Sequence, residues 1–319
     1  DSIVRMGTAL DGKQKMMDCF KRATDIQADY EYPFKVVMNG FLPRWCGDNS
    51  MSFAFAARCF ESPFRDTKIP EFGMHAIANG ALEGSGYAWQ RGIRNTPGLA
   101  GPALAYLKEK AEKSPFQATR DEAQLQKISI LIALGRYDEA NEVYRKLTPK
   151  KFWEVIRRFS STNISIGGNY SYFAWINYPE TLAVFTGKYG NELKMAEDAF
   201  IAGESRSALE ILEKLLKDKN LPLREKNHIF YLYGHWMLND DPSAARGGVV
   251  PAWHVSSWRK RPLTVLTKLL ELGIEPGFLS TRNRCTVLMV AINDCVDSEL
   301  IKRVAKKYPE SIRMADNDG

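Results

Sequence analysis

The chain has few of the side chains that build metal centres and disulfide frameworks. Its 319 residues include four histidines and five cysteines, and no two cysteines have CxxC spacing. Neither a disulfide scaffold nor a structural zinc site is therefore expected. We predict instead that the cysteines are small buried side chains in a reducing compartment. They are Cys19, Cys46, Cys59, Cys285 and Cys295.

The histidine spacing also argues against a metal site. His228 and His235 lie seven residues apart on a predicted helix, which separates them by about 10.5 Å along the helix axis. Two imidazoles at that separation cannot share a zinc ion at roughly 2 Å per ligand. We therefore predict no metal ligands and assign the histidines structural roles.

Motifs for nucleophilic catalysis and for cofactor binding are missing as well. Gly84-Ser85-Gly86 lacks the outer glycines of a nucleophile elbow, and Trp89 stands where a dinucleotide fingerprint needs its third glycine. The sequence predicts no catalytic residue and no cofactor. It also contains no run of 18 apolar residues, which excludes a membrane-spanning helix within this chain.

The overall composition is typical of a soluble globular protein. The chain is 45% hydrophobic and 26% charged, and its net charge is +6. This positive charge is diluted by interspersed Asp and Glu, which argues against a nucleic-acid binder and favours an acidic protein partner. Because Asp1 is not an initiator Met, we expect a removed segment before it. The cytoplasm is the expected compartment, with the periplasm as the alternative if that segment was a signal peptide.

Apolar residues recur at helical spacing in the first third of the chain. From Met16 to Ala23 they lie three or four residues apart, which predicts an amphipathic helix. Another helix is expected after Asp48-Asn49-Ser50, whose side-chain oxygens can cap it. A further helix is predicted from about Glu225 to Leu238.

The segments from Phe41 to Phe60 and from Gly86 to Gly92 resemble a bacterial family of unknown function. Its members carry a Leu-Pro-Arg-Trp-Gly-Gly-type turn before a Phe-Ala-containing helix. The chain differs from this pattern at Cys46, where a Gly is usual. The resemblance implies a helical bacterial protein and no particular chemistry.

An internal repeat lies in the middle of the chain. The offset from Gly135 to Gly203 equals that from Ala140 to Ala208, and it is twice a period of about 34 residues. The segment from Ile130 to Ala140 resembles the second half of a tetratricopeptide or Sel1-like unit. In such units a glycine tightens the turn between helices and a small alanine allows close helix approach. The resemblance implies an array of stacked helical hairpins over residues 1–240.

Two irregular segments interrupt or end this array. Residues 160–179 are rich in Ser, Asn, Gly and aromatic side chains, which predicts a packed loop insert. Residues 241–251 contain a Gly pair and two prolines, and we predict that they form a linker between two domains.

Beyond this linker the chain resembles ankyrin repeats. The residues from Thr286 to Ala291 match the Thr-Pro-Leu-His-x-Ala helix start, with Val for Pro and Met for His, and Leu266 to Gly273 match a second helix and its glycine cap. The resemblance implies an ankyrin-like stack over residues 252–319. Since two units would leave an apolar end exposed, we expect the native polypeptide to continue beyond Gly319.

These patterns predict an all-α protein with a tetratricopeptide-like array followed by ankyrin-like repeats. Stacked helical units without catalytic motifs are typical of protein-binding surfaces, so we expect a bacterial protein–protein interaction scaffold. By analogy of fold, we favour an immunity or inhibitor protein that binds a toxin or effector. Basic side chains and exposed aromatics are the expected contacts to an acidic partner. The candidates are Lys150, Lys151, Arg157, Arg158, Trp253, Trp258, Arg259, Lys260, Arg282 and Arg284.

Two other functions stay open at this point. The first is an enzyme or a regulatory subunit with its site in the 160–179 insert. The second is a nucleic-acid-linked adaptor that grips a single strand through interleaved aromatic and basic side chains. Such an adaptor predicts a steep salt dependence of binding.

Overall fold

The structure is a computed structural model. It describes residues 10–41, 49–83, 88–147, 178–239, 267–268, 270–273, 298–307 and 309. Every regular element in these ranges is a helix, and none is a strand. The prediction of an all-α protein is therefore confirmed for this part of the chain. None of the helices described is both long and apolar enough to cross a membrane.

The chain divides into two compact units, residues 1–182 and residues 183–319. The division falls within helix α12 (Tyr178–Phe185). The predicted linker 241–251 lies outside the described residues, as does the insert 160–179 up to the start of α12. The predicted domain boundary therefore stays a prediction.

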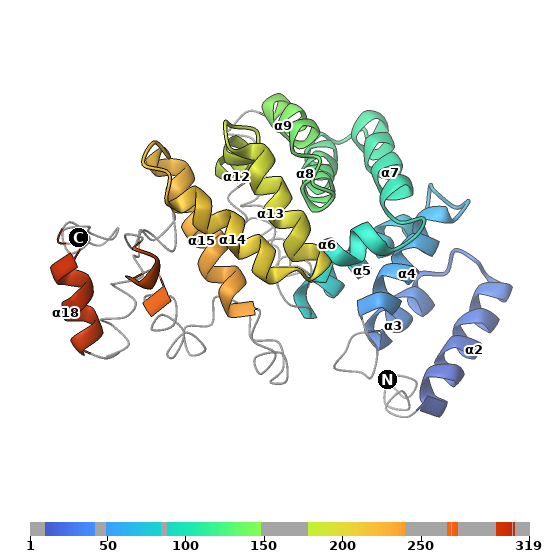
Figure 1. The fold of residues 1–319 in the computed structure, drawn as a ribbon. Helices are drawn as coiled ribbons and strands as arrows, with labels where there is room; N and C mark the ends of the chain where they lie inside the picture. Colours follow the sequence, from blue (N-terminus) through green and yellow to red (C-terminus); the bar gives the residue numbers. More distant parts are fainter. Residues whose placement is uncertain are drawn as a thin grey trace. The chain divides into compact units, whose positions relative to one another are not determined.

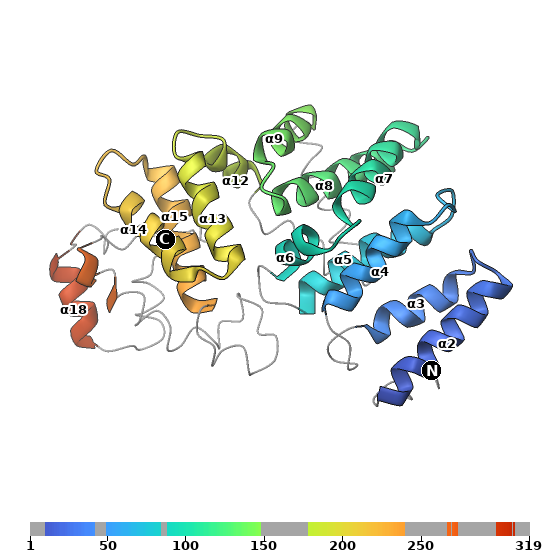
Figure 2. The same cartoon turned by 45° about the vertical axis from the view of Figure 1, so that its right-hand side comes forward.

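The N-terminal unit is built from consecutive helices that pack against one another. In Figures 1 and 2, α2 lies beside α3, and α4 lies beside α5. The helix expected around Met16 is confirmed as α2. The helix expected after the Asp-Asn-Ser cluster is α4, which begins inside that cluster, so Asn49 and Ser50 belong to the helix itself. The elements are α2 (Leu10–Ile26), α3 (Glu31–Gly40), α4 (Asn49–Glu61), α5 (Ile69–Glu83), α6 (Ala88–Asn95), α7 (Ala100–Lys113), α8 (Gln117–Ala133) and α9 (Tyr137–Lys146).

The two cysteines described in this unit differ in environment. Cys59 is buried in α4, as predicted, but Cys19 is exposed on α2, so the prediction was wrong there. The reason is the rotation of α2, which faces its neighbours through Met16 and Phe20. At 3.6 residues per turn, Cys19 lies to one side of that face.

The C-terminal unit contains α13 (Gly190–Ala202), α14 (Ser205–Leu216), α15 (Leu223–Asn239) and α18 (Ser298–Lys307). Helix α15 confirms the helix predicted between Glu225 and Leu238. Trp236 is fully buried, and its ring stacks on Phe200 at 4.7 Å between centroids. His228 is also buried, and burial, reinforced by the nearby Arg224, lowers its pKa to about 4. An imidazole that is neutral at physiological pH fits the structural role predicted for it.

The two glycines of the internal repeat form the same turn in both units. Gly135 joins α8 to α9 with φ 70°, and Gly203 joins α13 to α14 with φ 90°. In each turn the residue after the glycine donates its N–H to the carbonyl five residues earlier, at 2.9 Å and 2.8 Å. This pattern caps the last carbonyls of the first helix and needs a residue that tolerates left-handed backbone.

The alanines of the repeat also occupy equivalent places. Ala140 follows the first turn and Ala208 the second, and both are 0% exposed. A methyl side chain at this position lets the second helix of each hairpin approach the first closely. The repeat found in the sequence thus corresponds to two helical hairpins with the same turn and the same close contact.

We expect the Gly203→Ala variant to lower the free energy of unfolding by about 1–2 kcal/mol, the cost of left-handed backbone for a residue with a Cβ. No atom lies within 4 Å of the added methyl, so the loss would come from the backbone alone. Urea denaturation measures it. The matched control is Gly101→Ala in α7, where the space is also open and φ is not positive. There alanine needs no left-handed backbone, so we expect a change within roughly 0.5 kcal/mol of zero, and equal losses at both glycines would contradict this explanation.

Candidate functional site

An apolar groove opens between α2 and α4 in the N-terminal unit, with a cavity volume of about 570 Å³. Its described lining is mostly phenylalanine, methionine and alanine, and we call it the α2–α4 groove. The lining residues are Met17, Phe20, Thr24, Ala28, Phe34, Phe41, Met51, Ala54, Phe55, Arg58, Cys59, Ser62, Phe64 and Ile69.

The floor of the groove is a layer of phenylalanine rings. Phe55 of α4 contacts Phe41 at 5.6 Å and Phe34 at 6.2 Å between ring centroids, in edge and tilted arrangements. All three side chains are buried. Such ring pairs add about 0.5–1.5 kcal/mol each to the free energy of apolar burial. The floor is therefore held in place before any partner arrives.

The walls of the groove repeat with a fixed offset along the chain. Met17, Phe20, Thr24 and Ala28 line one wall, and Met51, Ala54, Arg58 and Ser62 line the other. Every residue of the second wall follows its counterpart at the same offset, a period of about 34 residues. In each wall the first three residues lie on the helix at a spacing of three or four, which puts one side chain on every helical turn. The fourth residue, Ala28 or Ser62, lies just beyond the end of its helix. Both helices therefore present the same kind of stripe to the space between them.

The wall carries one charged residue among its described members, Arg58. Its guanidinium lies 3.1 Å from the carboxylate of Glu61, and the two side chains are 83% and 44% exposed. An exposed pair of this kind contributes between 0 and about 1 kcal/mol, so Arg58 can exchange this partner for another carboxylate. The hydroxyl of Thr24 donates to the carbonyl of Phe20 at 3.0 Å, which leaves this wall residue largely apolar toward the groove.

Cys59 lies at the floor and is not a nucleophile. Burial raises the pKa of its thiol to about 12, so the thiol stays protonated at neutral pH. A reactive cysteine needs the opposite shift, toward the thiolate. The groove therefore offers shape and apolar surface and no covalent chemistry at this residue.

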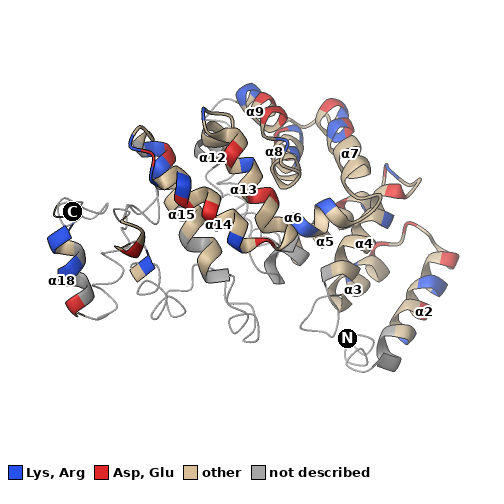
Figure 3. Cartoon of the chain, in the orientation of Figure 1, with Lys and Arg blue, Asp and Glu red and all other residues tan. Residues whose placement is uncertain are grey.

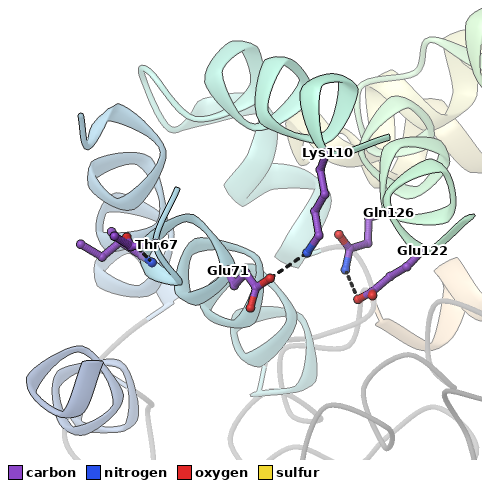
Figure 4. Close-up of polar contacts among 6 residues, drawn as sticks. Thr67, Glu71, Lys110, Glu122 and Gln126 are labelled. Carbon is purple, nitrogen blue, oxygen red and sulfur yellow. Dashed lines mark hydrogen bonds and ion pairs between the residues drawn. The ribbon is translucent and has the colours of Figure 1, made fainter. Parts of the chain in front are cut away.

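A half-buried ionic cluster joins α5, α7 and α8 in the same unit (Figure 4). Lys110 extends from α7 toward α5, and its ammonium lies 2.9 Å from the carboxylate of Glu71. Glu122 and Gln126 lie beside it on α8, where the amide of Gln126 donates to Glu122 at 3.0 Å. The Lys110 side chain is 15% exposed. We call these four residues the Lys110 cluster.

The charges of the Lys110 cluster depend on one another. Burial opposes the charge of Lys110, but Tyr106, Glu71 and Glu122 outweigh it, so the pKa of Lys110 is raised. Burial raises the pKa of Glu122, with Glu71 adding to the effect and Lys110 and Gln126 opposing it. A lysine whose pKa is raised is neither a nucleophile nor a base at neutral pH. The role that this chemistry supports is to connect three helices.

The Lys110 cluster does not have the composition of a metal centre. Among the residues described, no three His, Cys, Asp or Glu side chains gather closely enough to hold one metal ion. His75, one turn after Glu71 on α5, has a pKa lowered by burial, against the opposing effect of Glu71.

The ten residues predicted from the sequence to contact a partner all lie outside the described ranges, so these predictions stay untested. They are Lys150, Lys151, Arg157 and Arg158 in 148–177, Trp253, Trp258, Arg259 and Lys260 in 240–266, and Arg282 and Arg284 in 274–297.

Sequence reasoning missed both the α2–α4 groove and the Lys110 cluster. The constant offset between the two walls could have indicated the groove. The Lys110 cluster gives no such signal, because its members come from three helices whose charged residues share no periodic pattern.

Comparison of the chain with protein-family models, with curated proteins and with solved structures gives no match. The function is therefore inferred from the groove, the cluster and the repeated hairpins.

The Glu122→Gln variant is expected to be more stable than the wild type at neutral pH. Because the pKa of Glu122 is raised in the fold, the folded state holds this proton more tightly than the unfolded state. The contribution of protonated Glu122 to the free energy of unfolding is fully present below its ordinary pKa of 4.5. It is lost as the pH rises through the raised pKa of the folded state. Urea denaturation between pH 4 and 8 should show a gain that appears only above pH 4.5.

The contrasting variant is Lys110→Met, which leaves the two half-buried glutamates without their cation. We expect the free energy of unfolding to fall by roughly 2 kcal/mol at neutral pH. The loss should shrink on acidification, because the glutamates become neutral. A Lys110→Met variant as stable as the wild type at pH 7 would show that the cluster does not connect the helices.

Proposed function

We propose that the chain is a protein-binding scaffold whose N-terminal unit receives part of a partner protein in the α2–α4 groove. The observation that carries the proposal is the groove itself, about 570 Å³ of mostly apolar space with an ordered aromatic floor. At its end the large apolar side chain of Phe64 is 40% exposed. A mostly apolar cleft of roughly 300–1,000 Å³ is the usual form of a binding site on a protein.

The repeated geometry supports the finer proposal of a tetratricopeptide-like array. The two walls of the groove are related by one repeat period, and the two hairpin glycines are related by twice that period. Two helices in a unit of about 34 residues are the pattern of that class of repeat, whose stacked units form extended binding surfaces. The ankyrin-like stack over 252–319 rests on the sequence resemblance alone.

The charge balance supports a protein partner with an acidic surface. The chain carries a net charge of +6, while basic and acidic side chains intersperse along α2 and α9 (Figure 3). A modest positive excess of this kind helps an acidic partner approach without the dense field that nucleic acid requires. The narrowest form of the proposal is a bacterial immunity or inhibitor protein that blocks a toxin or effector, and its support is the analogy of fold.

The proposal is tested by capture of the partner with three baits, namely the wild type, Ala54→Arg and Ala202→Arg. Ala54 lies exposed on the groove wall, and Ala202 is an exposed helical alanine in α13 of the other unit. An arginine at Ala54 fills the groove with a charged side chain. We expect a stoichiometric protein partner with the wild type and the Ala202→Arg control, and at least tenfold less with Ala54→Arg, measured by quantitative mass spectrometry.

Unfolding curves of the three baits show whether each is folded. Equal recovery of every bound protein by the wild type and Ala54→Arg would contradict binding through the groove. A purified chain that turns over a substrate without any protein partner would point to an enzyme instead.

A further inference from the structure

We infer that the occupant of the α2–α4 groove is an amphipathic α-helix of the partner with an acidic residue beside its apolar face. This inference rests on the proposed function and names the part of the partner that the groove accepts. It follows from the spacing of the walls, the nature of the lining backbone, the open side of the groove and the charge at its edge.

The walls match a helix in spacing and in length. The helical stripe on one side runs from Met17 to Thr24 and that on the other from Met51 to Arg58, with one side chain on each turn. Seven residues at 1.5 Å rise span about 10 Å, or two helical turns. The side-chain ridges of a third helix can pack into the space between these two rows, in the ridges-into-grooves manner common to packed helices.

The backbone around the groove also favours a helical occupant. α2 and α4 satisfy their own N–H and C=O groups, so among the residues described the groove offers no strand edge to which an extended peptide could hydrogen-bond. An extended segment would therefore place unpaired backbone groups against the buried rings of the floor, which costs free energy. A helical segment already pairs its backbone N–H and C=O groups internally, so it avoids this cost.

The open side of the groove distinguishes an amphipathic helix from a lipid chain. A hydrocarbon chain in this groove would stay exposed to water along its open side. An amphipathic helix can turn its polar face to the water on that side, and only its apolar face has to be buried in the groove. The wall residue Ala54 is exposed and small, which leaves room for a large apolar side chain from above.

The charge at the groove indicates where the partner carries its acid. Arg58 is a cation on the wall, and its exposed pair with Glu61 is weak enough to exchange. Lys21 is exposed and follows Met17 by four residues, so it borders the opposite wall. A carboxylate at the border of the partner's apolar face can therefore pair with the guanidinium of Arg58.

The experiment selects 16-residue displayed peptides on the full chain, with counter-selection on the Ala54→Arg variant. The inference predicts enriched sequences with apolar residues at i, i+3 or i+4, and i+7, and with Asp or Glu next to them. A synthetic peptide of the enriched sequence should gain helical circular dichroism on binding. It should also shift the methyl resonances of Met17 and Met51, which line the groove, and leave that of Met195 on α13 unchanged.

A charge reversal tests the assignment of Arg58. Arg58→Glu should weaken binding of the selected peptide at least tenfold, and replacing the peptide's acidic residue by Lys should restore the affinity for this variant. Because Arg58 is 83% exposed, the variant is expected to fold, and its unfolding curve checks this. Equal binding of the acidic peptide by both proteins would overturn the pairing.

Three results would overturn the inferred helix. The first is that no peptide is enriched above the Ala54→Arg background. The second is that the enriched sequences lack a helical period. The third is that dodecanoate shifts the methyl resonances of Met17 and Met51 and the peptides do not. If a native partner depends on Ala54 but its bound segment is not helical, this inference fails and the proposed function stands. If peptides fill the groove but no native protein depends on Ala54, the proposed function fails.

Discussion

The ring layer around Phe55 is the interaction on which the groove depends. Phe55 of α4 contacts Phe20 of α2, Phe34 of α3 and Phe41 at the end of α3. A single buried side chain thereby connects two consecutive helical hairpins. Loss of a buried phenylalanine ring costs about 3–5 kcal/mol in proteins, so this layer is a large part of what orients α2 and α4. Without it the two walls would have no fixed separation.

Helix α5 connects the groove to the Lys110 cluster. Phe72 of α5 stacks on Phe34 at 5.8 Å between centroids, while its neighbour Glu71 pairs with Lys110 of α7. Adjacent residues on a helix point about 100° apart, so α5 contributes to the aromatic layer on one side and to the ionic cluster on the other. The apolar contact supplies most of the stabilisation. The ion pair requires a particular register between α5 and α7, because a displaced ammonium would remain half-buried without a partner.

Periodicity predicted helix α2 and the shared glycine turn of two hairpins correctly, because these features depend on residues close together in the chain. The apolar spacing around Met16 predicted α2, and the repeat that relates Gly135 to Gly203 predicted two equivalent turns. The burial of Cys19 was predicted wrongly, because spacing alone does not fix how α2 is rotated about its axis. That rotation is set by tertiary contacts such as the one between Phe20 and Phe34.

The candidate site was harder to predict than the fold for a physical reason. Glu71 and Lys110 each look like ordinary charged residues of an amphipathic helix, and only the packing of α7 on α5 places their charges together. The groove is different, because its two walls are related in the sequence by a constant offset and remain apart only because the ring layer fills the space below them. Helices α2 and α4 touch through Phe20 and Phe55, and contact along their whole length would have closed the same apolar residues into a core. An open groove thus follows from a floor that holds the two helices apart, and the buried side chains that form it, Phe34 and Phe55, lie beneath the exposed wall residues such as Ala54 that an occupant would contact first.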